Sequence, residues 1–541
     1  MKKFFPNNPY FILTFVFGLL FVRTFLNFEP IFTEGDQGRD LYCIKHVFDG
    51  QKPYLDFWWE YGPLMLYYYA LCFKLLGVSI QSVILGKQVI VFLSGIFVYL
   101  GAAAVIPPVL AFSAAVFFWI FRPDFFYTFN HIGGMFCTIL LLYALLQYFN
   151  RPKQKFLILG MISVIVLNLI RLNIGFSSLL AFLLSIYIFD KFNGKNKPWI
   201  FYAWVSAGTG IVTALIYIPF IIGVPQENLL KCFPYLPSYH AGSWTWVQGA
   251  TSFIKIVWFN FNATILRKIF GLLLAALSVR IIYLWRKDQI KKSSAGPILL
   301  SLIIFSVFNV HEYLASKYIF RLFWAFPSVV LLFFAIIHFG SNQFPDKIRK
   351  ILLFSIAILM VYLGISTADT ISYYKKPVNL FVYGSSRIYM ANAQWGEHKG
   401  LAVDHWAVPK WTHTVTAVTD YLKAQLNPGE PFLAIPYDSL YYFLSGHDSA
   451  VYPLAFFKYM NISPPEQIEM MHQLEQKHVR FIIISNRAYS HDPDLGVFGV
   501  DYCVLLKKYI FDHYKPVAAF GDFQGISNFQ ENHGVMILKK I

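Results

Sequence analysis

Charged residues are scarce in this chain of 541 residues. Asp, Glu, Lys and Arg make up 14% of it, whereas 57% of the residues are hydrophobic. Roughly a quarter of the residues of a soluble domain are charged, so this composition indicates a protein that crosses a membrane several times. The formal net charge is +16, yet from Asp369 onward fifteen Lys and Arg stand against sixteen Asp and Glu. The basic excess therefore lies in short loops of the membrane part, which follows the positive-inside rule and argues against a nucleic-acid partner.

Cysteine and the common hydrolase motifs are also scarce or absent. The five cysteines are scattered, with no Cys-x-x-Cys and no metal-ligand spacing, so neither a disulfide framework nor a zinc site is indicated. The sequence contains no Walker loop, G-x-S-x-G or H-E-x-x-H motif, so it offers no recognised machinery for hydrolysing a nucleotide, an ester or a peptide. No small-residue cleavage site follows the first apolar run, which is therefore expected to be retained as a membrane span.

Long apolar runs are what the chain has in abundance. Eleven membrane-spanning helices are predicted, near 10–29, 80–105, 106–121, 131–149, 156–171, 174–190, 199–222, 263–285, 296–312, 320–339 and 351–368. With the N-terminus in the cytoplasm, the cytoplasmic loops after the fourth, sixth, eighth and tenth spans each carry a basic cluster, as the positive-inside rule requires. The prediction is thus a multi-pass α-helical protein of the cell inner (cytoplasmic) membrane, with a transmembrane domain at 1–368.

The composition changes after residue 368 to that of a soluble α/β domain, predicted to lie outside the cytoplasm at 369–541. A helix at 421–426, strands at 431–436, 481–485 and 535–540, and a helix at 502–512 favour a small mixed or parallel sheet. Asp438 is predicted to cap a further helix that ends near Leu444.

Acidic residues gather in one loop. Of the thirteen Asp and Glu before residue 369, seven fall between residues 29 and 60. This first outer loop, 30–79, is predicted to end in an apolar helix at 64–77 that lies at the membrane interface. Carboxylates beside a bilayer are costly unless they are solvated, paired or used, so the loop is a candidate functional site.

Asp36 is the strongest catalytic candidate, because it directly follows the first span and can face both the membrane surface and an aqueous cleft. A carboxylate there can act as a general base toward an acceptor hydroxyl, with Arg39 as a neighbour that tunes it. The alternative is that Asp36 and Arg39 form an i,i+3 pair that caps a helix beginning near Gly38.

Asp56 and Glu60 flank an aromatic patch that includes Trp58 and Trp59. Carboxylates accept hydrogen bonds from sugar hydroxyls, and aromatic rings cover the apolar face of a pyranose, so the two acids are candidate substrate-binding residues. The alternative is an aromatic belt at the membrane interface with solvated acids, especially for Trp58 and Trp59.

Cations and polar groups on the outer side form a second candidate set. Arginine suits a lipid phosphate through bidentate contacts, and the candidates are Arg122, Arg171, Lys317 and Arg321. Snorkelling to headgroups is the alternative for any one of them, although Arg171 lies between apolar segments and needs a partner. Asp124 and His131 on the second outer loop are candidates for holding a substrate or a divalent ion, or else for helix capping and packing.

The order of these motifs resembles the GT-C superfamily of integral membrane glycosyltransferases, in particular the protein O-mannosyltransferase and lipid A aminoarabinose transferase group. The resemblance rests on the acids after the first span, G-x-x-P-Y-x-D (Gly50–Asp56), E-x-G-P-L (Glu60–Leu64), the Arg171 hairpin and the run from Lys317 to Pro327. This sequence departs from the family pattern at Gln37, where relatives often carry a second acid, and at Asn130 and His131, where many carry an Asp.

The resemblance implies transfer of a sugar from a polyprenyl-phosphate donor to an acceptor at the outer face, usually with inversion. It implies Asp36 as the base, and Arg171, Lys317 and Arg321 at the donor phosphate. The acceptor is a glycolipid, a protein or a glycan, and membrane lipids are further partners. No cofactor is certain, and a divalent metal ion is left open. The competing interpretations are a transporter or flippase for a lipid-linked sugar and a structural partner of another envelope protein.

Overall fold

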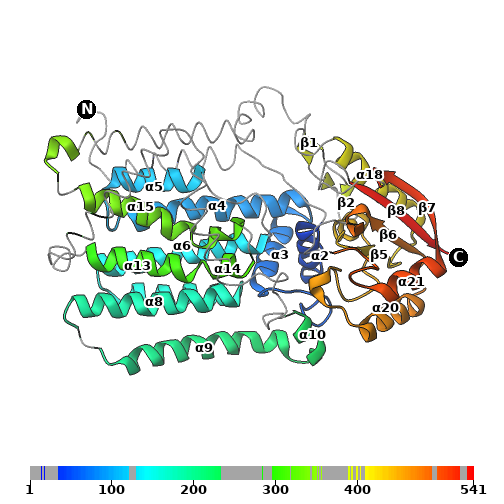
Figure 1. Cartoon of the computed structure of the whole chain (residues 1–541), viewed down its shortest axis with the longest axis horizontal. Helices are drawn as coiled ribbons and strands as arrows, with labels where there is room; N and C mark the ends of the chain where they lie inside the picture. Colours follow the sequence, from blue (N-terminus) through cyan, green and yellow to red (C-terminus); the bar gives the residue numbers. More distant parts are fainter. Residues whose placement is uncertain are drawn as a thin grey trace.

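The computed structural model describes most of the chain between residues 35 and 541. The described ranges are 35–120, 129–195, 197–232, 295–316, 319–341, 344–349, 409–489, 496–523 and 533–541, with four two-residue strands between 388 and 403 and a few single residues. A helical bundle forms one end of the molecule and an α/β domain the other, with two short helices between them (Figure 1).

The bundle helices match the apolar runs of the sequence. They are α4 (Ile80–Ala102), α5 (Pro108–Ile120), α6 (Phe129–Asn150), α7 (Gln154–Asn168), α8 (Leu172–Phe192), α9 (Trp199–Ile221), α13 (Ala295–Phe308) and α15 (Phe326–Ser341). Four of them, α4, α6, α8 and α9, are long and apolar enough to cross a membrane by themselves. The helical membrane part is therefore confirmed. The predicted spans 10–29, 263–285 and 351–368 lie outside the described residues, so the count of eleven stays a prediction.

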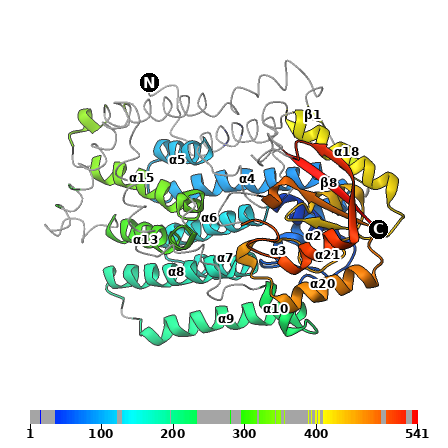
Figure 2. The same cartoon turned by 45° about the vertical axis from the view of Figure 1, so that its right-hand side comes forward.

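Helix α6 lies inside the bundle and α9 lies at its edge. Of the residues in the most apolar stretch of α6, 78% are buried, whereas 17% are buried in that of α9. Figure 2 shows α9 along the outer side of α8. Helices are suited to this environment because they satisfy their backbone polar groups internally. Hydroxyl groups on the helices bond the preceding turn, as Ser94 does to the Ile90 carbonyl at 2.8 Å.

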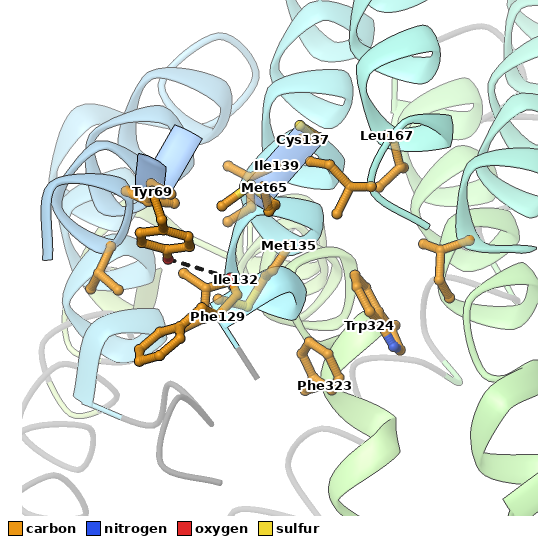
Figure 3. Close-up of a cluster of buried hydrophobic side chains, with 14 of the residues drawn as sticks. Met65, Tyr69, Phe129, Ile132, Met135, Cys137, Ile139, Leu167, Phe323 and Trp324 are labelled. Carbon is orange, nitrogen blue, oxygen red and sulfur yellow. Dashed lines mark hydrogen bonds between the residues drawn. The ribbon is translucent and has the colours of Figure 1, made fainter. Parts of the chain in front are cut away.

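Two short helices, α2 (Asp36–Phe48) and α3 (Leu64–Leu76), join the bundle to the α/β domain. The predicted interfacial helix at 64–77 corresponds to α3. Figure 3 shows its Met65 and Tyr69 among side chains of α6, and the Tyr69 hydroxyl donates to the Phe129 carbonyl at 3.4 Å. The helix predicted to begin near Gly38 is α2, which begins at Asp36.

The C-terminal part is an α/β domain with a mixed sheet, as predicted. Its elements are α18 (Pro409–Gln425), β5 (Leu433–Ile435), α19 (Leu440–Ser445), η5 (Lys458–Met460), α20 (Pro464–Gln476), β6 (Phe481–Ser485), η6 (Asn486–Tyr489), α21 (Val504–His513), β7 (Tyr514–Gly521) and β8 (Gly534–Lys540). The strand order is β5-β6-β8-β7, with β5 parallel to β6 and the other pairs antiparallel. Two two-stranded ribbons precede it: β1 (Ile388–Tyr389) with β4 (Ala402–Val403), and β2 (Asn392–Ala393) with β3 (His398–Lys399). The predicted boundary at 368/369 lies outside the described residues.

Four details of this domain differ from the prediction. The helix predicted at 421–426 is only the end of α18, which begins at Pro409. The N-cap of α19 is Ser439, and the Asp438 carboxylate instead accepts a hydrogen bond from the Ser485 hydroxyl of β6 at 2.7 Å. Strand β7 was not expected, because it follows α21 without an intervening turn signal and most of its side chains are at least partly exposed. Helix α20 was also missed, although Ser463 and Glu466 form a capping box at its start.

The α/β domain docks on α2 through close backbone approach and a few polar contacts. A Cβ atom on Gly38 would overlap the backbone nitrogen of Leu440, so α2 and α19 approach as closely as a glycine allows. The Ser449 backbone N–H donates to the Tyr42 hydroxyl at 3.2 Å. The start of α2 and the domain are thus one packed unit.

We expect Gly38→Ala to destabilise the protein by about 1 to 3 kcal/mol, because the added methyl group must push α19 away from α2. Gly208→Ala in α9 is the matched control, since a Cβ there meets nothing within 4 Å and alanine is the better helix former. Denaturant unfolding of the full chain in one detergent, with limited proteolysis of the α/β domain, measures both effects. Equal stability of the two variants would contradict the close approach.

Candidate active site

Asp36 lies in the first turn of α2, at the junction between α2 and the α/β domain. Its Oδ1 accepts a hydrogen bond from the Tyr437 hydroxyl at 2.5 Å and lies 3.8 Å from Arg39 Nη1. The side chain is 48% exposed. The predicted i,i+3 pair with Arg39 is therefore present, and the carboxylate nonetheless stays accessible. A half-exposed, oriented carboxylate has the geometry that a general base needs.

Arg39 is buried under Asp36 and is 1% exposed. Its guanidinium donates to Asp40 Oδ1 at 2.9 Å and to the Glu60 carboxylate. It also lies 5.4 Å from the ring centre of Trp59. A buried cation must be paired in this way, and the pairing occupies the donors that a substrate would need. Arg39 was predicted to bind substrate. Its position fits a different role better, that of a buried residue that orders the first outer loop.

Asp40 connects this cluster to the bundle. Its Oδ2 accepts from the Phe129 backbone N–H at 2.9 Å, at the N-terminus of α6, where a helix has unsatisfied N–H groups. Burial raises the pKa of Asp40 to about 7, against the opposing effect of the Arg39 charge.

Arg171 is the centre of a second buried cluster, and it has the partner that its position requires. It immediately precedes α8, and its Nε and Nη2 donate to Glu312 Oε1 at 2.6 and 2.5 Å. Glu312 belongs to α14 (His311–Ser316). The third guanidinium nitrogen, Nη1, lies 3.0 Å from His131 Nε2. The structure thereby brings together two residues that were predicted as site candidates, Arg171 and His131.

Glu312 also accepts hydrogen bonds from two other side chains and pairs with a second arginine. The Asn173 amide donates to Oε1 at 2.7 Å, the Trp324 indole donates to Oε2 at 2.9 Å, and Arg321 Nη1 lies 3.7 Å from Oε2. Glu312 thus lies as the counter-charge between two guanidinium groups. Arg321, in η2 (Ile319–Trp324), keeps a side chain that is 21% exposed.

The Tyr61 ring joins the two clusters. Its centre lies 5.2 Å from the guanidinium carbon of Arg39 and 4.9 Å from that of Arg171. The backbone explains the position, because the Gly62 N–H donates to the Ile170 carbonyl at 3.0 Å. Six of the predicted residues therefore belong to one continuous network: Asp36, Arg39, Glu60, His131, Arg171 and Arg321.

Several predicted residues lie elsewhere or take another role. Asp56 is exposed, and its carboxylate accepts from the Lys52 backbone N–H at 2.7 Å within its own turn. Glu60 is buried and paired with Arg39, so it is a structural partner rather than an exposed sugar ligand. Trp58 and Trp59 are 2% and 1% exposed, which rules out the interface belt expected for them. Arg122, Asp124 and Lys317 lie outside the described residues.

Sequence reasoning missed Asp40, Glu312 and Tyr437. The need of Arg171 for a partner was a signal for Glu312, but it did not say which of the distant acids would supply it. Tyr437 carried no signal of its own. Within the described ranges, no three His, Cys, Asp or Glu side chains lie together in a way that could hold a metal ion.

Comparison with known proteins gives the fold. No protein-family model matches the sequence, and no curated protein sequence does. Among solved structures, the oligosaccharyltransferase AglB from Archaeoglobus fulgidus, in complex with an inhibitory peptide and a dolichol-phosphate, matches over 96% of this chain and 73% of its own, with 14% identity and a TM-score of 0.54. ArnT from Cupriavidus metallidurans matches over 97% of both chains: bound to undecaprenyl phosphate it gives 11% identity and a TM-score of 0.53, and in the apo state 12% and 0.55.

These similarities extend over nearly the whole chain, including the C-terminal part. The chain therefore shares its fold with ArnT and AglB, which confirms, at the level of the fold, the resemblance seen in the sequence. At such low identity the comparison carries over no residue and no substrate.

We expect Glu312→Gln to cost about 3 to 5 kcal/mol of stability, because it leaves the Arg171 guanidinium buried without its counter-charge. Glu475→Gln is the control, since Glu475 pairs with Lys540 at the surface and such pairs contribute about 0 to 1 kcal/mol. Denaturant unfolding of both variants in the same detergent makes the comparison. Equal losses would show that the Arg171 charge is not held by Glu312.

Proposed function

We propose that the chain is a membrane glycosyltransferase that transfers a sugar from a polyprenyl-phosphate donor to an acceptor hydroxyl or phosphate. The observation that carries this proposal is the network itself: a half-exposed carboxylate, Asp36, is joined through Arg39 and Tyr61 to the cationic cluster of Arg171 and Arg321. Further support comes from the fold shared with AglB, bound to a dolichol-phosphate, and with ArnT, bound to undecaprenyl phosphate.

In this proposal Asp36 is the catalytic base. Its carboxylate takes the proton of the acceptor hydroxyl as the acceptor oxygen forms a bond to the anomeric carbon. The bond from that carbon to the donor phosphate oxygen breaks, and its electron pair leaves with the lipid phosphate. The proton on Asp36 then passes to solvent. One base opposite the leaving group is the arrangement of a direct displacement with inversion, by analogy with inverting glycosidases.

The departing phosphate needs a cation rather than a general acid, because a lipid phosphate is already a tolerable leaving group. We assign this role first to Arg321, whose side chain is 21% exposed and lies 3.7 Å from the Glu312 carboxylate. Arg171 is held tightly by Glu312 and is assigned to fixing the site. Lys317 and Arg122 remain proposed phosphate ligands, and His131 and Asp124 remain proposed to help hold the substrate.

We further propose that the N-terminus lies in the cytoplasm and the 369–541 domain outside it, in the cell inner membrane. The support is the charge of the loops. Basic residues surround the turns that follow α6 and α8, and such basic turns favour the cytoplasmic side; they are Arg151, Lys153 and Lys155, and Lys191, Lys195 and Lys197. The acidic segment and the α/β domain then share the outer side.

Asp36→Asn tests the proposal against a transporter or a structural protein. We expect loss of transfer by roughly 10²- to 10⁴-fold, the usual contribution of a general base, with undecaprenyl phosphate binding retained. Asp49→Asn is the matched control: it also removes an exposed carboxylate at an end of α2, where Asp49 pairs with Lys45.

The assay supplies a panel of undecaprenyl-phosphate monosaccharides to the full chain in nanodiscs, with membranes of the source cells as the acceptor. Mass spectrometry follows the release of undecaprenyl phosphate. A folded Asp36→Asn variant that works at the wild-type rate would overturn the transferase proposal, whereas a transporter or a scaffold would barely notice the change.

A further inference from the structure

We infer that Tyr437 is a positioning residue for Asp36, so that the C-terminal α/β domain completes the active site. The inference rests on the proposed function, in which Asp36 is the base. Tyr437 lies between β5 and α19, 401 residues along the chain from Asp36. Its role would be to hold the carboxylate in one orientation while the acceptor hydroxyl approaches.

The contacts of Asp36 place both constraints on a single oxygen. Oδ1 accepts from the Tyr437 hydroxyl at 2.5 Å and faces Arg39 Nη1 at 3.8 Å. The side chain as a whole is nevertheless 48% exposed. We therefore assign proton abstraction to the other oxygen, Oδ2. A base held at one oxygen presents the other in a fixed direction, which is how an oriented group lowers the entropic cost of reaction.

The Tyr437 ring is itself held from several sides. Its centre lies 5.9 Å from the guanidinium carbon of Arg39 and 5.7 Å from that of Arg487. Arg487 Nη1 also donates to the Tyr437 carbonyl at 3.2 Å, and the Phe457 ring packs edge-on at 5.1 Å. The residue is 6% exposed. A phenol fixed in this way directs its hydroxyl at one point.

The backbone before Asp36 is shaped to receive this ring. A Cβ atom on Gly35 would lie 2.9 Å from Tyr437 Cδ1 and 3.1 Å from Arg487 Nη1, closer than ordinary packing allows. Glycine is thus the residue that lets the Tyr437 side chain reach the first turn of α2.

The protonation state of Tyr437 suits a donor. Burial and the nearby carboxylates of Asp36 and Glu60 raise the pKa of the phenol well above its ordinary value, against the effect of Arg39. The hydroxyl therefore keeps its proton at all physiological pH values. It donates to Asp36 and does not compete with it as a base.

The alternative is that this hydrogen bond only fastens the domain to α2. The chain offers a matched case, because the Tyr452 hydroxyl donates to the Tyr54 carbonyl at 2.6 Å across the same junction. Tyr452 and Tyr437 thus each donate a hydrogen bond from the α/β domain to the first outer loop. They differ in the acceptor, because Tyr437 bonds the carboxylate of the proposed base, whereas Tyr452 bonds a backbone carbonyl and also lies 3.2 Å from Cys232 Sγ.

The experiment compares Tyr437→Phe with Tyr452→Phe, each in the full chain in nanodiscs. We expect kcat of Tyr437→Phe to fall roughly 10- to 100-fold, the scale of a misplaced catalytic group, while KM for the undecaprenyl-phosphate monosaccharide stays within about twofold. We expect Tyr452→Phe to keep kcat within about twofold. The unfolding temperature of each variant measures how much stability its lost hydrogen bond supplies, separately from the effect on kcat.

Gly35→Ala is the second variant, and it keeps the Tyr437 hydroxyl while its added methyl group displaces the ring. We expect it to lower kcat as well. A wild-type kcat in Tyr437→Phe or, where that variant does not fold, in Gly35→Ala would overturn the inference. So would equal losses in Tyr437→Phe and Tyr452→Phe. An inactive Asp36→Asn beside an active Tyr437→Phe refutes only this inference, whereas an active Asp36→Asn refutes the proposed function.

Discussion

The buried charge of Arg39 is the constraint on which the arrangement of this site depends. A guanidinium removed from water costs several kcal/mol unless carboxylates surround it. Asp40 comes from the same helix as Arg39. Glu60 lies 21 residues beyond Arg39, so the first outer loop must fold back to bring it to the guanidinium. Asp40 in turn binds the first backbone N–H of α6. One cation thereby fixes the loop, the start of α2 and the top of the bundle together.

The second cation, Arg171, is neutralised separately by Glu312, and the Tyr61 ring stands between the two guanidinium groups. Arg39 and Arg171 therefore each have their own carboxylate partners, and the Tyr61 ring attracts both cations. The cluster presents preorganised charges in a largely buried setting, where they act without reorganisation during a reaction. Arg321 is the more exposed of the two arginines beside Glu312, and it is then the group best placed to respond to a new anion.

Sequence reasoning was sufficient for features that depend on neighbouring residues. Apolar runs located the described bundle helices, the spacing of Asp36 and Arg39 implied their pairing, and the apolar flanks of Arg171 implied a buried partner. It failed where the partner is far away, because Glu312 lies 141 residues from Arg171 and Tyr437 lies 401 residues from Asp36. It also failed for Trp58 and Trp59, because an aromatic pair has the same composition in a core as at a membrane interface.

The C-terminal domain illustrates why such distant contacts are hidden in a sequence. Gly35 and Gly38 are three residues apart at the start of α2, and both lie against the segment from Tyr437 to Leu440. Either glycine by itself is unremarkable in a loop or a helix, and its meaning appears only when the opposing backbone is known. Because the domain approaches at the very turn that carries Asp36, its docking and the orientation of that carboxylate are one physical event. A displacement of the domain from α2 must therefore also release Asp36 from its hydrogen bond.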